Sequence, residues 1–273
     1  MDNMSIDTKP AINNAKKNMT EKNIAARLMF DGSKYHGWQV QKSEVTVAGT
    51  IEAALGRLCG HTVKVHGCGR TDAGVHGERY CFNFRTSSTI PVDRLPFAVN
   101  TLLPREIAVQ SAVCASDDFD ANLSCIKKEY TYRIYNTRIR DPFHASKVLF
   151  YANKLNLDDM REAARHFVGT HDFAAVRSMG TVTKTTVRTV HWYEIEEKGS
   201  IVELRVCADG FLYNMARAMA GTLLYVSEGK IRPGELPSIL ESKDRRFAGP
   251  TVPPDGLYLT RIWYDGIVGD MMR

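Results

Sequence analysis

The sequence lacks the marks of several protein classes. Its six cysteines include no C-x-x-C pair, so we expect reduced thiols in a cytoplasmic protein rather than a disulfide framework or a structural zinc site. The most apolar run, residues 211–226, is too short to span a membrane and contains Arg217. Residues 1–23 have neither the apolar core nor the cleavage site of a secretory signal, which predicts a disordered polar arm.

The composition is that of an ordinary soluble protein. The chain has 273 residues, of which 44% are hydrophobic and 25% charged, enough to bury a core in one large or two modest domains. Lys and Arg number 36 against 31 Asp and Glu, which gives a net charge of +5. This mild excess permits a polyanionic partner without demanding one.

Hydrophobic periodicity predicts the same succession of elements in each half of the chain. In the first half we expect strands at 24–30, 62–68, 80–84 and 107–113 and helices at 46–58 and 92–103. In the second half we expect strands at 129–136, 189–197, 201–208 and 256–264 and helices at 157–169, 211–229 and 234–242. Both halves therefore read β-α-β-β-α-β, which is the ferredoxin-like arrangement.

This succession predicts an α+β fold of two ferredoxin-like halves, with their sheets side by side and a central cleft between them. We place the boundary in the polar stretch 114–124. Residues 24–115 would then form an N-terminal α+β domain that carries a glycine-rich loop, and residues 116–273 a C-terminal α+β domain that completes the cleft.

The glycine-rich stretch GCGRTDAGVHG, residues 67–77, has four glycines, which permit positive φ and close backbone approach. Such a loop can cradle a phosphate, form a structural turn, or present Asp72 as a reagent. The absence of a G-K-[ST] ending and of a following helix argues against the phosphate-binding interpretation. A plain turn, for its part, has no use for Arg70, Asp72 and His76 together.

Arg217 lies among apolar residues in the predicted helix 211–229. A guanidinium on a largely buried helix is costly unless a carboxylate pairs with it or the side chain reaches solvent. Asp72 and Asp209 are both candidate partners, and periodicity does not choose between them. Pairing with Arg217 would hold Asp72 ionised and oriented, as a nucleophile or general base requires.

The segment 127–147, KKEYTYRIYNTRIRDPFHASK, combines six Lys and Arg with three tyrosines. Cations suit phosphates and aromatic rings suit stacked bases, so this composition is typical of nucleic-acid contact. Tyr130 and Tyr132 would share one sheet face, whereas Tyr135 would lie on the other. The alternative is an ordinary strand with the tyrosines that strands favour.

Six blocks of sequence, in order, resemble the tRNA pseudouridine synthase A (TruA) family. They are DGSKYHGWQVQ (31–41), GRTDAGVHG (69–77), KKEYTYRIYN (127–136), GTHDF (169–173), GFLYNMARAMAGTLL (210–224) and TVPPDGLYL (251–259). The likeness spans about residues 24–264, and GRTDAGVHG is its most specific block. It implies the pseudouridine synthase fold and an isomerase that converts uridine to pseudouridine at positions 38 to 40, in the anticodon arm of tRNA.

The resemblance also implies roles for five residues. Asp72 is the catalytic nucleophile, and Arg217 is the basic residue that pairs with it. Tyr130 stacks on the target uracil, Arg70 helps to hold the target nucleotide out of the stack, and Leu257 packs against the target base. The family works as a homodimer in which each tRNA touches both subunits, and it needs neither metal nor cofactor.

Some positions depart from the family's pattern. The chain has Phe119 to Asn122, FDAN, where the family commonly has Phe-His-Ala-Arg, and Val40 where an arginine is frequent. Val176 replaces a second aromatic after HDF. The lost basic groups would affect tRNA affinity and the choice among uridines rather than the reaction type.

Two other functions use the same features. An RNA-binding module without catalysis, such as a chaperone that opens tRNA, would need the basic, tyrosine-bearing segment but not Asp72. A nucleotide-binding protein would use the glycines for phosphate, and would bind a mononucleotide without any affinity for tRNA.

Overall fold

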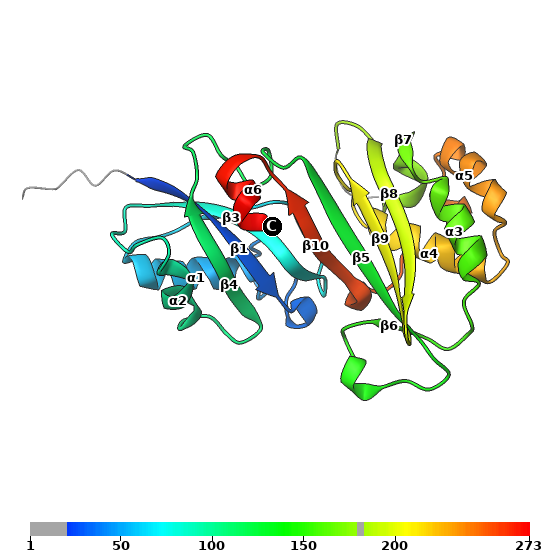
Figure 1. The fold of residues 1–273 in the computed structure, drawn as a ribbon, viewed down its shortest axis with the longest axis horizontal. Coiled ribbons are helices and arrows are strands. Elements are labelled where there is room, and N and C mark those ends of the chain that lie inside the picture. The colour runs from blue at the N-terminus through cyan, green and yellow to red at the C-terminus, as the bar shows by residue number, and fades with distance from the viewer. Residues whose placement is uncertain (1–20, 179–182) are drawn as a thin grey trace, which may run out of the picture.

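The computed structural model describes residues 21–178 and 183–273, so all but the last three residues of the predicted arm lie outside the described part. Within these residues ten strands form one continuous sheet, in the order β4-β1-β3-β10-β5-β9-β8-β7 (Figure 1). The two remaining short strands pair beside this path, β2 with β3 and β6 with β5. None of the helices in the described residues is long and apolar enough to cross a bilayer.

Each half of the chain contributes strands and helices to the sheet. The first half contains β1 (Lys22–Phe30), α1 (Val47–Cys59), β2 (Val65–Gly67), β3 (His76–Thr86), α2 (Leu95–Asn100) and β4 (Ile107–Cys114). The second half begins with β5 (Lys127–Asn136), β6 (Leu149–Tyr151), α3 (Leu157–Arg165), β7 (Gly169–Asp172), β8 (Val187–Lys198) and β9 (Ile201–Ala208). It ends with α4 (Met215–Ser227), α5 (Leu236–Ser242), β10 (Leu257–Trp263) and α6 (Gly266–Met272).

The strand order confirms the predicted fold class. In the first half the strands run β4-β1-β3-β2, and every pair is antiparallel. In the second half the corresponding order is β10-β5-β9-β8, again antiparallel throughout. Each half therefore has the ferredoxin-like strand order that its β-α-β-β-α-β succession predicts.

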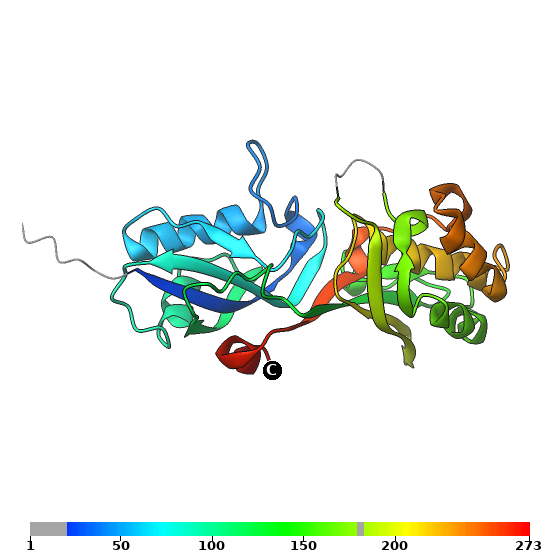
Figure 2. The same ribbon diagram turned by 90° about the horizontal axis from the view of Figure 1, so that it is seen from above.

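The two halves are joined by a parallel pair between β3 and β10. Tyr258 pairs with His76, and Leu259 pairs with Gly77. The predicted side-by-side sheets thus share their inner edges, and the chain segments that precede β3 and β10 meet at this junction. Figure 2 shows the sheet with α1 on one side and α6 on the other.

Local sequence signals account for α1. The Thr46 side chain accepts a hydrogen bond from Gly49 N, so it caps the first turn as predicted. Gly60 ends the helix in the left-handed conformation, with φ 73°. Ile51 and Leu55 face the core, where they are fully buried.

The structure differs from the sequence-based prediction at one element that bears on the site. Helix α4 begins at Met215 rather than at residue 211, because Asn214 has a left-handed backbone with φ 59° and ψ 9°. The apolar periodicity of 211–229 carries no sign of this interruption. Strands β6 and β7 and helix α6 are too short to show a clear period, and the sequence did not predict them.

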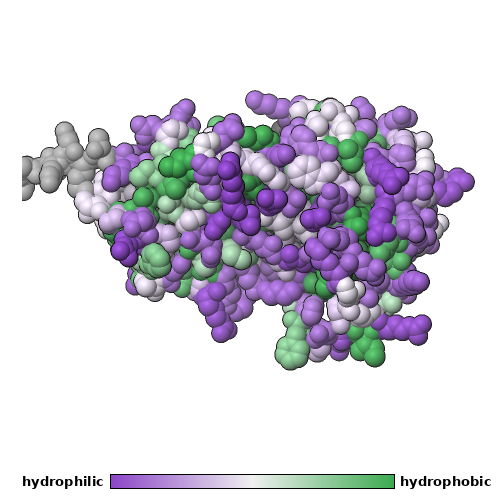
Figure 3. Space-filling view, in the orientation of Figure 1, coloured by the Kyte–Doolittle hydropathy of each residue, from purple (hydrophilic) through white to green (hydrophobic). Residues whose placement is uncertain are grey.

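The connection between β5 and β6 projects from the molecule. Its Ile139 is 80% exposed and its Phe143 is 95% exposed. The face drawn in Figure 3 is otherwise mostly hydrophilic, with smaller apolar areas over both halves. The end of this connection returns to the junction of β3 and β10, where Lys147 O accepts a hydrogen bond from Tyr258 Oη at 2.7 Å.

Packing beneath the glycine-rich loop leaves no room for a side chain at Gly67. Trp38 stacks on Tyr80 with ring centroids 4.3 Å apart. A Cβ on Gly67 would lie 2.3 Å from Tyr80 Oη and 2.4 Å from Trp38 Cε2. The glycine at position 67 is therefore required by the packing of the aromatic core.

We expect Gly67→Ala to lower the free energy of unfolding by about 1–3 kcal/mol, because the methyl group overpacks the Trp38–Tyr80 stack. Gly234→Ala is the control, since a Cβ there has no atom within 4 Å. It should change stability by less than about 0.5 kcal/mol. Urea unfolding measures both, and equal losses in the two variants would contradict the packing argument.

Candidate active site

Asp72 lies in the loop that connects β2 to β3. Val75 N donates a hydrogen bond to Asp72 O at 3.2 Å, which closes a four-residue turn. Trp38 N donates to Thr71 O at 3.2 Å. The block 31–41 therefore supports the loop from behind, a role that its sequence alone did not reveal.

Gly74 is required at the next corner of this loop. Its φ is +83°, a region that side chains disfavour, and a Cβ there would lie 2.8 Å from Pro254 Cγ. Gly74 N donates to Tyr35 O at 3.2 Å. The loop is thus packed between the 31–41 block and the segment that leads into β10.

The structure pairs Asp72 with Arg217. Arg217 Nη1 lies 3.3 Å from Asp72 Oδ2, and the two side chains are 15% and 28% exposed. Asp209, the other candidate partner, instead accepts a hydrogen bond from Thr189 N at 3.0 Å. The ion pair joins the loop of the first half to helix α4 of the second.

Two further acceptors hold the Arg217 guanidinium. Its Nε donates to Val252 O at 2.7 Å, and its Nη1 donates to Asn214 Oδ1 at 2.8 Å. Val252 N in turn donates to Arg217 O at 3.5 Å. The guanidinium is therefore fixed by the segment before β10 and by the start of α4, independently of Asp72.

Burial and charge act in opposite directions on Asp72. Burial raises the pKa of Asp72 above its ordinary value, and the charge and hydrogen bond of Arg217 partly offset this rise. The sequence-based expectation that Arg217 favours the ionised form is correct in sign, but burial has the larger effect. The result is a carboxylate that is oriented, partly dehydrated and more basic than one in water.

Tyr130 and Leu257 form an apolar wall beside Asp72. Tyr130 is 9% exposed and meets the edge of Phe211, with ring centroids 4.8 Å apart and planes at 81°. Leu257 is buried at the start of β10 and faces the same cleft. Tyr132 lies on the same sheet face, as predicted, but its hydroxyl donates to Pro253 O at 2.8 Å in the core. Phe211, assigned by sequence to a helix, belongs to this wall instead.

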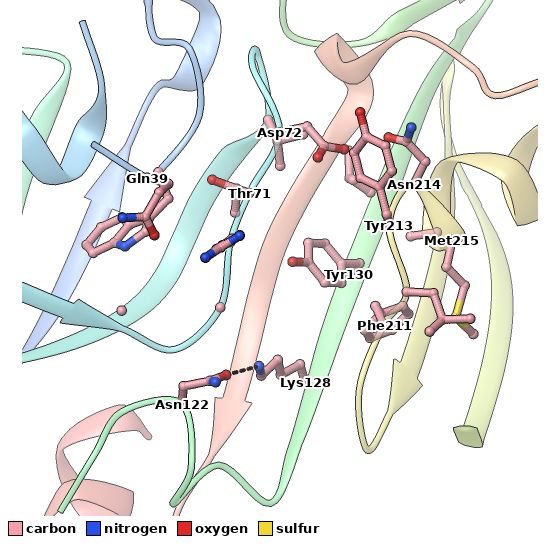
Figure 4. Close-up of a pocket in the computed structure, with 18 of the residues that line it drawn as sticks. Gln39, Thr71, Asp72, Asn122, Lys128, Tyr130, Phe211, Tyr213, Asn214 and Met215 are labelled. Atoms are coloured by element: carbon pink, nitrogen blue, oxygen red, sulfur yellow. Dashed lines mark hydrogen bonds between the residues drawn. The ribbon is translucent and has the colours of Figure 1, made fainter. Parts of the chain in front are cut away.

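These residues line one cleft of about 970 Å³. All five residues to which the resemblance gave roles face it, and Figure 4 shows Asp72, Tyr130, Tyr213 and Asn214 around the opening. Its charged lining comprises Lys64, Arg70, Lys128, Arg188 and Arg217 against Glu52, Asp72 and Asp120. The cleft is therefore net basic, with one acid held at its centre by an ion pair.

Three of the positions that depart from the family's pattern also line the cleft. They are Val40, Asp120 and Asn122. Asn122 Oδ1 accepts a hydrogen bond from Lys128 Nζ at 3.4 Å, the contact drawn in Figure 4. Val176, in contrast, is fully buried and does not face the cleft.

Most of the basic residues in the segment 127–147 contact the protein itself. The Lys127 ammonium lies 4.7 Å from the Trp192 ring centroid. Arg133 Nη1 and Nε form ion pairs with Glu78 at 2.6 Å and with Glu203 at 3.0 Å. Arg138 and Arg140 are exposed in the projecting connection, so the segment as a whole is less available to a polyanion than its composition indicates.

His76 has a structural role. Its Nδ1 accepts from Gly32 N at 3.1 Å, so its Nε2 carries the proton and donates to Asp255 O at 3.1 Å. Burial, reinforced by Lys147, lowers the pKa of His76, which keeps the ring neutral. His76 thus ties the first half to the segment before β10 rather than acting on a ligand.

Metal-binding side chains do not gather at the cleft. In residues 21–178 and 183–273, no three His, Cys, Asp or Glu side chains lie together as a metal site requires. All six cysteines are free thiols, and burial raises the pKa of Cys68, the first residue of the β2–β3 loop, to about 12. Cys68 is therefore a neutral packing group.

Known proteins resemble this chain over most of its length. The sequence profile of a family described as tRNA pseudouridine synthase matches residues 25–122 and 163–265. The tRNA pseudouridine synthases A of Caldicellulosiruptor bescii and Acetivibrio thermocellus are each 42% identical over 243 residues, 89% of this chain and 100% of each relative. That of Bacillus subtilis is 42% identical over 244 residues, 89% of this chain and 99% of the relative. The chain therefore belongs to the tRNA pseudouridine synthase A (TruA) family.

Proposed function

We propose that this chain converts uridine to pseudouridine in the anticodon arm of tRNA, at positions 38 to 40, with Asp72 as the reacting carboxylate. Family membership makes the protein an isomerase that acts on tRNA. The observation that carries the residue assignment is the Asp72–Arg217 ion pair of 3.3 Å, inside a cleft that also presents Tyr130.

The reaction explains why the cleft needs an apolar wall. Pseudouridine forms when the N1–C1′ bond breaks, the uracil turns, and C5 bonds to C1′. A base cannot turn while stacked in a helix, so the nucleotide must leave the stack, at a cost of a few kcal/mol. Tyr130 and Leu257 offer an aromatic and an aliphatic surface that replace part of the lost stacking.

The carboxylate can begin the reaction in three ways. It can attack C1′ of the ribose, attack C6 of the base, or remove a proton during the rearrangement. Each requires an ionised Asp72 aimed into the cleft, and the contact with Arg217 supports that state. Substrate and product are isomers, so no redox cofactor or co-substrate enters the balance.

Arg70 is proposed to hold the displaced nucleotide. Its side chain is exposed at the rim of the cleft, one residue beyond Gly69 and two before Asp72. A guanidinium there can fill the space left in the stack and contact the neighbouring phosphate.

The resemblance further implies a homodimer in the cytoplasm, and we propose both. Cytoplasmic residence follows from a tRNA substrate and is compatible with six free thiols. Light scattering decides between one copy and two, since the single chain has a mass of 30.6 kDa.

Asp72→Asn removes the reacting carboxylate at nearly constant size. We expect pseudouridine formation in unmodified tRNA to fall by at least about 10³-fold, equivalent to about 4 kcal/mol of barrier, with tRNA affinity retained. Mass spectrometry of the modified tRNA measures the product. Asp209→Asn, outside the cleft, is the control and should keep the wild-type rate.

An Asp72→Asn enzyme that still isomerises uridine would contradict the proposed role of Asp72. Tight tRNA binding without product from the wild-type protein would instead favour a non-catalytic RNA-binding module.

Arg217→Met leaves the burial of Asp72 unopposed, so the pKa of Asp72 should rise further. Because the ionised form reacts, the acid side of the rate–pH profile should move to higher pH, and the rate at neutral pH should fall by about 10²-fold. Arg217→Lys keeps the positive charge but loses the several N–H donors of the guanidinium. Its rate–pH profile should therefore shift less than that of Arg217→Met. An unshifted profile in Arg217→Met would show that the ion pair does not tune Asp72.

Arg70→Gln should weaken tRNA binding and lower the slope of log affinity against log salt by about 1, because one phosphate contact is lost. Filter binding at several salt concentrations measures the slope. Arg232→Gln is the control, since Arg232 lies outside the cleft and pairs with Glu235 at 2.6 Å. Equal slopes for Arg70→Gln and wild type would place Arg70 away from the phosphates.

A further inference from the structure

Asn214, the residue before α4, has a backbone that few side chains tolerate. Its φ of 59° and ψ of 9° lie in the left-handed region, where asparagine is among the least disfavoured residues. An asparagine at this position usually caps the helix with its side chain, but Asn214 makes no such bond. Its side chain lies near Asp72 in the cleft, as Figure 4 shows.

The amide of Asn214 makes two hydrogen bonds of 2.8 Å. Its Oδ1 accepts from Arg217 Nη1, and its Nδ2 donates to Ser178 Oγ. A guanidinium only donates, so the orientation of the amide follows from its contact with Arg217. Ser178 is itself held, because its N donates to Tyr213 O at 3.0 Å.

One nitrogen atom connects Asn214 to the reacting carboxylate. Arg217 Nη1 lies 2.8 Å from Asn214 Oδ1 and 3.3 Å from Asp72 Oδ2. The contact with Asn214 is thus the shorter of the two. A neutral acceptor can fix this nitrogen without competing for the charge that Asp72 needs.

We propose that Asn214 is a positioning residue, which holds Arg217 Nη1 where it pairs with Asp72. The inference rests on the proposed function, in which Asp72 is the group that reacts. Asn214 acts through Arg217, and its backbone conformation directs the amide into the cleft instead of toward the first turn of α4.

Several other ionisable groups share the cleft with Asp72. They are Glu52 of α1, Lys64, His66 and Arg70 before β3, Asp120 before β5, Lys128 and Tyr130 of β5, Arg188 of β8, and Tyr213 and Arg217 around the start of α4. Among the described residues, Arg217 is the ion-pair partner of Asp72. A carboxylate at position 214, 2.8 Å from Arg217 Nη1, would therefore compete for the ion-pair partner of Asp72.

Asn214→Asp and Asn214→Gly test the proposal. The aspartate has nearly the same shape, but its charge attracts Arg217 and repels Asp72, so the acid side of the rate–pH profile should move to higher pH, with a loss of about 10- to 100-fold near pH 6. Glycine keeps the left-handed backbone without the side chain, so kcat should fall about tenfold with KM for tRNA within about threefold.

The unfolding temperature separates positioning from stability. We expect both variants to unfold close to the wild-type temperature, because the buried core does not contain the Asn214 side chain. A lower unfolding temperature in both variants, with a wild-type pH profile, would overturn the proposal and make the residue merely structural.

A readout without activity keeps this inference separate from the proposed function. The carboxyl carbon of Asp72, followed by NMR, should titrate at higher pH in Asn214→Asp than in wild type. An unchanged titration would overturn the positioning role even if Asp72→Asn is inactive. Activity in Asp72→Asn would overturn the proposed function, while the shifted titration would still support the link from Asn214 to Asp72.

Discussion

The parallel pairing of β3 with β10 is the contact on which the site depends. It joins two sheets that could otherwise form separate layers, and it does so at the position where the Asp72 loop enters β3. His76 strengthens the junction by stacking on Tyr258, with ring centroids 4.5 Å apart, and by its bond to Asp255 O. Asp72 comes from one side of this junction, and Arg217, Tyr130 and Leu257 come from the other.

Burial and charge have opposite effects on the ionisation of Asp72 in the cleft. Burial favours the protonated form of Asp72, which Arg217 partly offsets. Outside the cleft, Arg133 of β5 is neutralised within the protein by ion pairs with Glu78 and Glu203. The cleft differs because Arg70 lies exposed at its rim. Positive charge is thus exposed beside Asp72, the carboxylate that we propose reacts in its ionised form.

The repeated succession of strands and helices could be predicted from the sequence. Burial of one face gives each strand or helix a regular spacing of apolar residues. The sequence also predicts the ends of α1, since Thr46 and Gly60 act locally. The ion-pair partner of Arg217 is set by tertiary structure, which periodicity does not reveal. Asp72 and Asp209 were therefore equally good candidates until the family resemblance favoured Asp72. The sequence did not reveal the role of Asn214 either, because its side-chain contact with Ser178 joins residues 36 positions apart and leaves no mark on the apolar period. The division at residue 115 stays a prediction.

The ion pair links residues 145 positions apart, and Leu257 comes later still. A chain emerging from the ribosome therefore exposes the Asp72 loop long before its counter-charge and its apolar wall exist. During synthesis the loop is therefore made without the residues that complete the cleft around it. The cleft is complete only when the last strand, β10, pairs between β3 and β5 and closes the sheet.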